Sequence, residues 1–364
     1  MAERILENGT AVQKKKAGEY LQIAGQFRSQ RQEIAESTRK AQLVVGVRKR
    51  RLYDAQNGSD LPGKLVRNEG GAPTADLAVN EAYDGSGATY DLFSEIFSRN
   101  SIDNRGMKIL STVHFLEGYD NAFWNGEQMV YGDGDEDLPE EERLFNRFTV
   151  AIDIIGHELT HGITQYEANL VYQDQSGALN ESFSDVFGSL VKQRVNHQTA
   201  AQADWLIGEG LFTSNVKGRG IRSMKAPGTA YDDPVLGSDP QPGHMSDYNG
   251  TAADNGGVHI NSGIPNKAFY NVAITLGGNA WEKAGRIWYR ALRNELNQTS
   301  DFRAAANACF KVAGQLYGID SDEQRAVYQG WTAVGLTPAG TVSKSGCRAS
   351  IRRIWQSIFW GPNP

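Results

Sequence analysis

Three features are scarce or missing in this 364-residue sequence, and each excludes a class of protein. The two cysteines, Cys309 and Cys347, lie in unlike surroundings, which argues against a disulfide-bonded framework. No apolar run approaches the roughly 18 residues of a membrane span, and the first 30 residues contain no signal-peptide core. Positive charge is not in excess, since the net charge is −6, so the sequence predicts no nucleic-acid partner.

What remains is an ordinary soluble, globular composition, with 40% hydrophobic and 22% charged residues, in a chain long enough for two lobes. Residues 1–47 predict a small helical segment, and the basic cluster at 48–51 is interpreted as an exposed junction that a protease could cut. Residues 48–162 predict an α+β lobe, and residues 163–338 predict a mainly helical lobe. The tail at 339–364 is of uncertain structure, and a partner-binding or membrane-surface role is the less favoured alternative for it.

A five-residue motif, HELTH at 157–161, lies within an apolar pattern that predicts a buried helix. Residues four apart lie one turn apart on one face of a helix, so the imidazoles of His157 and His161 can bind one cation. Glu158 is rotated by about 100° from His157, which places it beside the open side of the metal, where it suits a general base. The alternative is an accidental match, with both histidines hydrogen-bonded in a core.

A catalytic zinc site needs a third protein ligand. Glu181 lies in the segment GALNESFSD at 177–185, where a second predicted helix begins after a glycine-containing turn. Asp185 and Asn180 are each candidates to accept the free ring N–H of one zinc-binding histidine. Taken singly, Glu181 and Asp185 are more often a helix-start carboxylate and a solvated side chain. Their spacing after the first motif favours a metal site.

These two segments and several others resemble the thermolysin-like family of zinc metalloendopeptidases, and within it the protealysin-like branch with a short propeptide. The resemblance covers roughly residues 52–337. It rests on HELTH, GALNESFSD, NAFWNGEQMVYGDGD at 121–135, IGEG at 207–210, IRSM at 221–224 and DNGGVHINSGIPNKAFY at 254–270. It implies a two-lobed α+β fold, with a mixed α/β-sheet N-terminal lobe, a mainly helical C-terminal lobe and the zinc site in the cleft between them.

The resemblance also implies roles for individual residues. It implies that one catalytic zinc ion is bound by His157, His161 and Glu181, and that Glu158 takes a proton from the attacking water. The other implied catalytic residues, which stabilise the oxyanion or support that function, are His259, Tyr172, Asp254 and Arg222. In this scheme Asp254 orients His259, while Arg222 binds a substrate carbonyl and braces the zinc-ligand region.

The implied function is neutral endopeptidase activity on internal bonds of peptide or protein substrates, on the N-terminal side of bulky hydrophobic residues. Asn121 and Ala122 match an edge-strand segment that pairs with the substrate backbone. Ile154 and Ile221 are the candidate walls of the pocket for the hydrophobic residue.

Calcium is the less certain cofactor. Asp153, Asp204 and Glu209 match three carboxylates of the family's double calcium site, but Lys192 stands where a bridging glutamate is expected. An ammonium group cannot ligate calcium, and its charge replaces that of the second ion. The sequence therefore predicts one calcium ion or none.

Residues 1–47 resemble the short propeptide but lack its Pro-Pro-containing start, so the sequence does not decide whether they are inhibitory or cleaved. The resemblance implies a secreted monomer, whereas the absence of a signal-peptide core leaves unconventional export and cytoplasmic residence as alternatives. The rival function is a catalytically silent binding or scaffold protein whose cleft is blocked by its N-terminal segment. A nearer rival is a zinc exopeptidase, against which the 121–135 and 254–270 segments argue.

Overall fold

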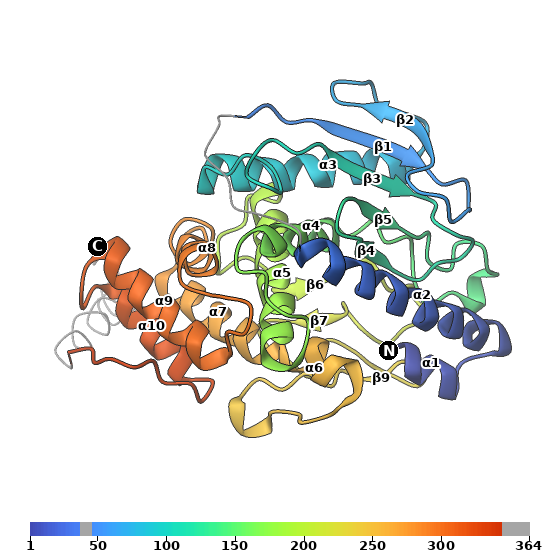
Figure 1. The fold of residues 1–364 in the computed structure, drawn as a ribbon. Coiled ribbons are helices and arrows are strands. Elements are labelled where there is room, and N and C mark those ends of the chain that lie inside the picture. The colour runs from blue at the N-terminus through green and yellow to red at the C-terminus, as the bar shows by residue number, and fades with distance from the viewer. Residues whose placement is uncertain (37–45, 344–364) are drawn as a thin grey trace, which may run out of the picture.

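The computed structural model describes residues 1–36 and 46–343 and forms two lobes (Figure 1). A five-stranded mixed sheet lies in the N-terminal lobe and most of the helices lie in the C-terminal lobe, which confirms the predicted α+β class. In chain order the elements are α1 (Ala2–Asn8), α2 (Ala11–Glu36), β1 (Arg50–Asp54), β2 (Lys64–Asn68), α3 (Leu77–Asp91), the π-helix η1 (Leu92–Ile96), β3 (Ile109–Val113), β4 (Ala122–Trp124), β5 (Met129–Tyr131), the 3-10 helix η2 (Glu140–Glu142), α4 (Ile152–Tyr166), α5 (Asp174–Val195), β6 (Leu206–Ile207), β7 (Arg222–Ser223), β8 (Asp232–Asp233), β9 (Gly237–Ser238), the 3-10 helix η3 (Met245–Asp247), α6 (Ala253–Asn261), α7 (Gly263–Leu276), α8 (Ala284–Asn294), α9 (Phe302–Tyr317) and α10 (Asp322–Thr332).

The sheet has the strand order β2-β1-β3-β5-β4. Strand β1 pairs antiparallel with β2 and parallel with β3, β3 pairs parallel with β5, and β4 pairs antiparallel with β5. Helix α3 packs against β1 and β3, and α4 packs against β4. Because β4 ends this order, one of its edges is not paired within the sheet and lies next to the helix that carries the HELTH motif.

Glycines allow α4 and α5 to approach closely. A Cβ atom at Gly188 would lie 2.4 Å from the carbonyl oxygen of Asp153, and one at Gly156 would lie 3.0 Å from the Cα of Gly188. Larger residues would force the helices apart, since protein interiors leave no free space for such atoms. The predicted start of the second helix within 177–185 is wrong, because α5 begins at Asp174 and Gly177 packs inside it against Val258.

The C-terminal lobe is closed by helices α7 to α10 around buried aromatic rings. Trp288 of α8 and Trp331 of α10 stack with ring centroids 5.9 Å apart, and Phe269 of α7 meets Trp288 edge-on. Helical periodicity does not extend through residues 196–252, where the described structure is irregular apart from η3 and two short antiparallel pairs, β6–β7 and β8–β9. Glycine, aspartate and proline are frequent there and favour turns over helices.

The N-terminal helices lie across the front of the molecule, against both lobes (Figure 1). In α2, Tyr20 and Ile23 pack against a cluster formed by Phe115, Tyr119, Phe123 and Val130. In α1, the side chain of Arg4 lies beside Gly237 of the C-terminal lobe. The segment therefore packs against the cluster that includes Phe123 of the edge strand β4, and it also contacts the opposite lobe.

The basic cluster at 48–51 is only in part the exposed junction that the sequence predicted, since Lys49 is exposed and Arg50 is buried. Arg50 is only 4% exposed and lies in β1, where its guanidinium group donates to Glu69 and to the carbonyl of Tyr83. Arg48 forms an ion pair with Asp91. Since these contacts join the cluster to the N-terminal lobe, a cut inside it would remove part of the lobe's own packing.

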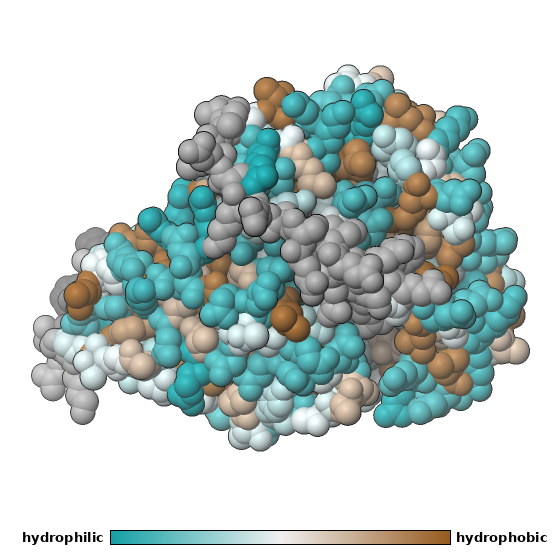
Figure 2. Space-filling model, viewed as in Figure 1, coloured by the Kyte–Doolittle hydropathy of each residue, from teal (hydrophilic) through white to brown (hydrophobic). Residues whose placement is uncertain are grey.

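None of the helices in the described part of the chain is long and apolar enough to cross a membrane. On the face shown in Figure 2, hydrophobic residues form small separate groups among hydrophilic ones. Such scattered exposure is usual for protein surfaces in water.

His114 connects the end of β3 to the start of α3. Its ring nitrogens lie 2.7 Å from Asp133 and 2.7 Å from Asp76, the residue whose carboxylate caps α3. The hydrogen bond with Asp133 and the one with Asp76 raise the pKa of His114 to about 9, although burial opposes the shift. The stabilisation is therefore complete below the ordinary histidine pKa and is lost as the pH rises through about 9.

We expect His114→Asn to lower the melting temperature by about 2 °C at pH 6 and to have little effect at pH 10. Asparagine suits this position because His114 has a φ of 54°, a left-handed conformation that asparagine tolerates. Thermal unfolding of both proteins across this pH range checks the prediction. A melting-temperature difference that does not change with pH would contradict it.

Candidate active site

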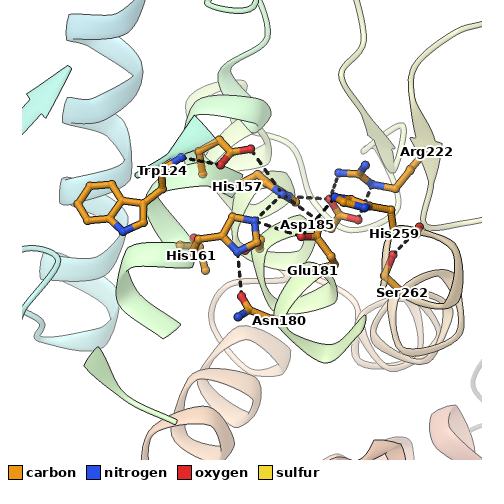
Figure 3. A network of polar contacts seen from close by, with 12 residues as sticks. Trp124, His157, His161, Asn180, Glu181, Asp185, Arg222, His259 and Ser262 are labelled. Carbon is orange, nitrogen blue, oxygen red and sulfur yellow. Dashed lines mark hydrogen bonds and ion pairs between the residues drawn. The ribbon is translucent and has the colours of Figure 1, made fainter. Parts of the chain in front are cut away.

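Two histidines and a glutamate meet between α4 and α5 (Figure 3). The Nε2 atoms of His157 and His161 are 3.1 Å apart, and each lies 3.4 Å from one carboxylate oxygen of Glu181. Possible ligand atoms of all three residues lie within 4.8 Å of one another, and the three side chains are buried. The structure thus brings together the three residues that the sequence predicted as metal ligands.

The hydrogen bonds of the two rings indicate that this site is built for a cation. His157 Nδ1 lies 2.8 Å from Asp185, and His161 Nδ1 lies 2.8 Å from the side-chain oxygen of Asn180, so each Nδ1 carries the donated proton. Both Nε2 atoms then point lone pairs toward Glu181, whose Oε2 is buried and has no hydrogen-bond partner within residues 1–36 and 46–343. Three electron-pair donors facing one another fit a metal ion with two histidine ligands and one carboxylate ligand.

Asp185 orients the ring of His157 and is itself held by residues of β7 and α7. Arg222 donates two hydrogen bonds to it, of 2.7 and 2.6 Å, and Asn266 donates one of 2.8 Å. Burial opposes ionisation, but the charge of Arg222 and the hydrogen bond with His157 lower the pKa of Asp185 to about 2. Arg222 therefore braces the metal-ligand region, as the resemblance implied, and Asn266 is a contributor that the sequence reasoning missed.

We expect Asp185→Asn to weaken zinc binding about 10- to 100-fold, because the amide cannot orient His157 as an anionic acceptor does. Competition with a chromophoric chelator measures this affinity. The matched control is Asp232→Asn, which removes an exposed carboxylate that accepts from Ser238. Equal zinc affinities for the Asp185 variant and the control would contradict the assigned orienting function.

Glu158 lies beside the triad without joining it. Its Oε1 is 3.9 Å from His157 Nε2, and its Oε2 accepts a hydrogen bond of 3.1 Å from the backbone N–H of Trp124 in β4. The edge strand and the carboxylate are thus connected directly. The sequence reasoning missed this contact, because no side-chain pattern reports a backbone donor.

His259 reaches the triad from the loop at the start of α6. Residues 254–257 all have positive φ, a run that two glycines permit and that aspartate and asparagine tolerate. This turn brings Asp254 back onto His259, where it accepts from the backbone N–H at 2.8 Å and lies 2.6 Å from Nδ1. Burial alone would lower the pKa of His259, but the charges of Asp254 and Glu181 outweigh it and raise the pKa.

Tyr172 completes this side of the site. Its hydroxyl donates to Glu181 and lies 3.0 Å from His259 Nε2, so two polar groups from separate segments converge next to the metal-binding atoms. Ala122 begins β4 and Asn121 precedes it, while Ile154 and Ile221 both lie beside Gly208, near His157 and Arg222 respectively.

The residues matched to a calcium site instead surround an ammonium group. Lys192 Nζ lies 3.1 Å from Asp153, 3.0 Å from Asp204, 3.8 Å from Glu209 and 2.9 Å from the carbonyl oxygen of Leu206. Lys192 and Asp153 are buried. A cation already occupies the position between the carboxylates, so these residues do not fit calcium.

The HELTH helix supplies two histidines and faces a glutamate as the third ligand residue, between an α+β lobe and a helical lobe. This arrangement defines a metallopeptidase with a two-histidine, one-glutamate site. Two family models match the chain: the thermolysin metallopeptidase catalytic domain over residues 11–165 and the thermolysin metallopeptidase α-helical domain over residues 168–336. The chain belongs to the thermolysin family of metallopeptidases. It is a metalloendopeptidase, and the family implies zinc as the metal.

Individual relatives agree with this assignment. The chain is 50% identical over 334 residues to an extracellular metalloprotease of Pectobacterium carotovorum subsp. carotovorum, covering 92% of this chain and 93% of the relative. It is 43% identical over 295 residues to the thermolysin of Bacillus sp. (strain EA1), covering 78% of this chain and 50% of the relative. The solved precursor of protealysin from Serratia proteamaculans is 51% identical, with a TM-score of 0.82, and the match covers 92% of this chain and 97% of that one.

Proposed function

We propose that this chain hydrolyses internal peptide bonds at one catalytic zinc ion bound by His157, His161 and Glu181. The observation that carries the proposal is the convergence of three possible metal-ligand atoms on one buried point, with Glu158 directly beside it. When bound, zinc supplies Lewis-acid polarisation of the scissile carbonyl and makes the attacking water more acidic.

Glu158 is the general base in this proposal. Its carboxylate accepts the proton of the attacking water and passes it to the leaving amine. The N–H of Trp124 holds one carboxylate oxygen, which limits the rotamers of Glu158 and keeps its carboxylate beside the metal-binding atoms. The separation of Oε1 from His157 Nε2, at 3.9 Å, supports a position next to the atoms that would bind the metal.

The oxyanion that forms during attack is stabilised by His259 and Tyr172. Asp254 fixes the ring of His259 through Nδ1 and favours its protonated form, which leaves Nε2 as a donor. The Tyr172 hydroxyl, 3.0 Å away, is the second donor. Arg222 keeps Asp185 charged and, by resemblance, also binds a substrate carbonyl.

The substrate pairs as an extended strand with the outer edge of β4, beginning near Asn121 and Ala122. This places its backbone on the strand whose N–H at Trp124 already holds the general base. Ile154 and Ile221 form apolar walls for a bulky residue just after the cut bond, which gives the preference expected from the family.

Calcium is not a cofactor in this proposal, since the ammonium of Lys192 neutralises the carboxylates that would bind it. Residues 48–162 and 163–338 are the two peptidase lobes, although α4 continues past residue 162 to Tyr166. The chain acts as a monomer outside the cell, as the extracellular relative suggests.

Residues 1–47 are a zymogen segment that covers the substrate strand until it is removed. Support comes from the packing of Tyr20 and Ile23 against the hydrophobic cluster that includes Phe123 of β4, in which Tyr20 meets the ring of Tyr119. The cut lies before Arg48, because Arg48 and Arg50 are tied into the N-terminal lobe. The tail at 344–364 lies outside the described residues.

The test is hydrolysis of an internally quenched peptide, blocked at both ends, by the zinc-loaded full chain before and after processing. We expect cleavage that a zinc chelator abolishes and added zinc restores. Blocked ends distinguish an endopeptidase from an exopeptidase. Absence of hydrolysis after loss of residues 1–47, with zinc shown to be bound, would favour the silent scaffold protein instead.

A further inference from the structure

Three carboxylates surround the ammonium group of Lys16 beside the substrate strand. Lys16 Nζ, from α2, lies 2.5 Å from Asp137 and 3.4 Å from Asp135, and only 11% of its side chain is exposed. Asp120 adjoins the same group, with one buried carboxylate oxygen that has no hydrogen-bond partner among the described residues. We call Asp120, Asp135 and Asp137 the acidic pocket.

The acidic pocket belongs to the N-terminal lobe, and the backbone of that lobe holds Asp135 in place independently of Lys16. Asp135 is 1% exposed, and its second oxygen accepts from the backbone N–H groups of Leu144 and Phe145, at 2.8 and 3.0 Å. Burial and the neighbouring charge of Asp135 raise the pKa of Asp120 well above its usual range, which favours its neutral form. Lys16 still faces the carboxylates of both Asp135 and Asp137, and removing its ammonium group would leave these two groups without their positive partner.

The acidic pocket lies along the path of the substrate. Asp120 directly precedes Asn121 and the strand β4, and four residues later the N–H of Trp124 donates to Glu158. Four residues of chain span at most about 14 Å. An extended substrate on β4 advances about 3.3 Å per residue, so the pocket is within reach of a long side chain a few residues from the cut bond.

We propose that, once residues 1–47 have left, the acidic pocket binds the lysine or arginine side chain of the substrate, and that Lys16 holds this subsite in the zymogen. The proposal rests on the release of residues 1–47 proposed above. It assigns the enzyme a second specificity, for a basic residue at one fixed position, in addition to the hydrophobic pocket. Arginine fits as well as lysine because its planar group pairs with two carboxylates at once.

The test uses the zinc-loaded full chain, incubated until residues 1–47 are removed. Internally quenched peptides share one hydrophobic cleavage site and carry lysine, arginine, alanine or glutamate at each of four positions on either side. We expect kcat/KM to be about tenfold higher for lysine or arginine than for alanine at a single position. Asp137→Asn and Asp120→Asn should bring that ratio close to one, whereas the control Glu141→Gln, an exposed acidic neighbour, should retain it.

A ratio near one at every position in the wild-type enzyme would overturn the proposal. If the chain keeps residues 1–47 and cleaves nothing, the proposed release has failed, and the subsite is tested by thermal unfolding of full-length Lys16→Ala. Propylammonium chloride, a small cation that replaces the deleted end of the lysine side chain, should then raise its melting temperature more than sodium chloride does, and should lose that advantage in Lys16→Ala/Asp137→Asn. Equal shifts with the two salts would overturn the proposal in that case.

Discussion

Replacement of Glu158 by glutamine is expected to lower kcat/KM for a blocked, internally quenched peptide by about 10³- to 10⁴-fold while zinc stays bound. The amide retains the size of the side chain and the acceptor for the Trp124 N–H, but it cannot take a proton from water. Because Glu158 is not one of the three converging ligand residues, the metal content should stay at that of the wild-type protein. Single-turnover kinetics and metal analysis of the same preparation measure both quantities.

Glu117→Gln is a matched control for this substitution, since it removes a carboxylate from an exposed position of the same lobe. Its activity should equal that of the wild-type enzyme. Substantial hydrolysis by Glu158→Gln would show that another group accepts the proton. Loss of zinc from Glu158→Gln would instead show that this residue supports metal binding, and either result would require a different assignment.

The second large effect is expected at Lys192. Lys192→Met should destabilise the protein by about 3–5 kcal/mol at neutral pH, because it leaves the carboxylates of Asp153 and Asp204 without their positive partner. Burial already raises the pKa of Asp153, and Lys192 opposes that shift. The destabilisation caused by Lys192→Met should therefore be smaller at acidic pH, where Asp153 can become neutral. Urea unfolding at pH 5 and pH 8 measures the difference.

The substitution Lys192→Glu tests whether the charge of Lys192 replaces calcium at this site. It restores an all-oxygen set of ligands, so millimolar calcium should raise the melting temperature of this variant and leave the wild-type protein unchanged. The control for Lys192→Met is Lys283→Met, which breaks an exposed ion pair with Glu323 and should lower the free energy of unfolding by less than about 1 kcal/mol. A wild-type protein that calcium stabilises strongly would disprove the replacement of calcium by Lys192.

The metal ligands were predictable from the sequence because helix geometry links residues at fixed spacing. His157 and His161 are one turn apart on α4, and the spacing from Glu181 to Asp185 is likewise one turn of α5, so each helix presents a pair of side chains to the other. Only the resemblance supplied His259, Tyr172 and Arg222, since residues so far apart in sequence have no local pattern that connects them. The burial of Arg50 was predicted wrongly, because a basic cluster looks exposed until its partners, Glu69 and the carbonyl of Tyr83, are known.

The sequence by itself determined the chemistry of this protein: a zinc-type ligand set, an adjacent carboxylate base and the α+β class. These depend on residue type and on periodicities of a few residues, which local backbone geometry translates into faces of helices and strands. Only the tertiary structure decided that the Trp124 N–H holds Glu158, that Lys192 lies among the carboxylates of Asp153 and Asp204, and that Lys16 fills the acidic pocket. Each of these contacts joins segments distant in sequence, and it exists because packing of the whole chain, rather than any local preference, brings the two partners together.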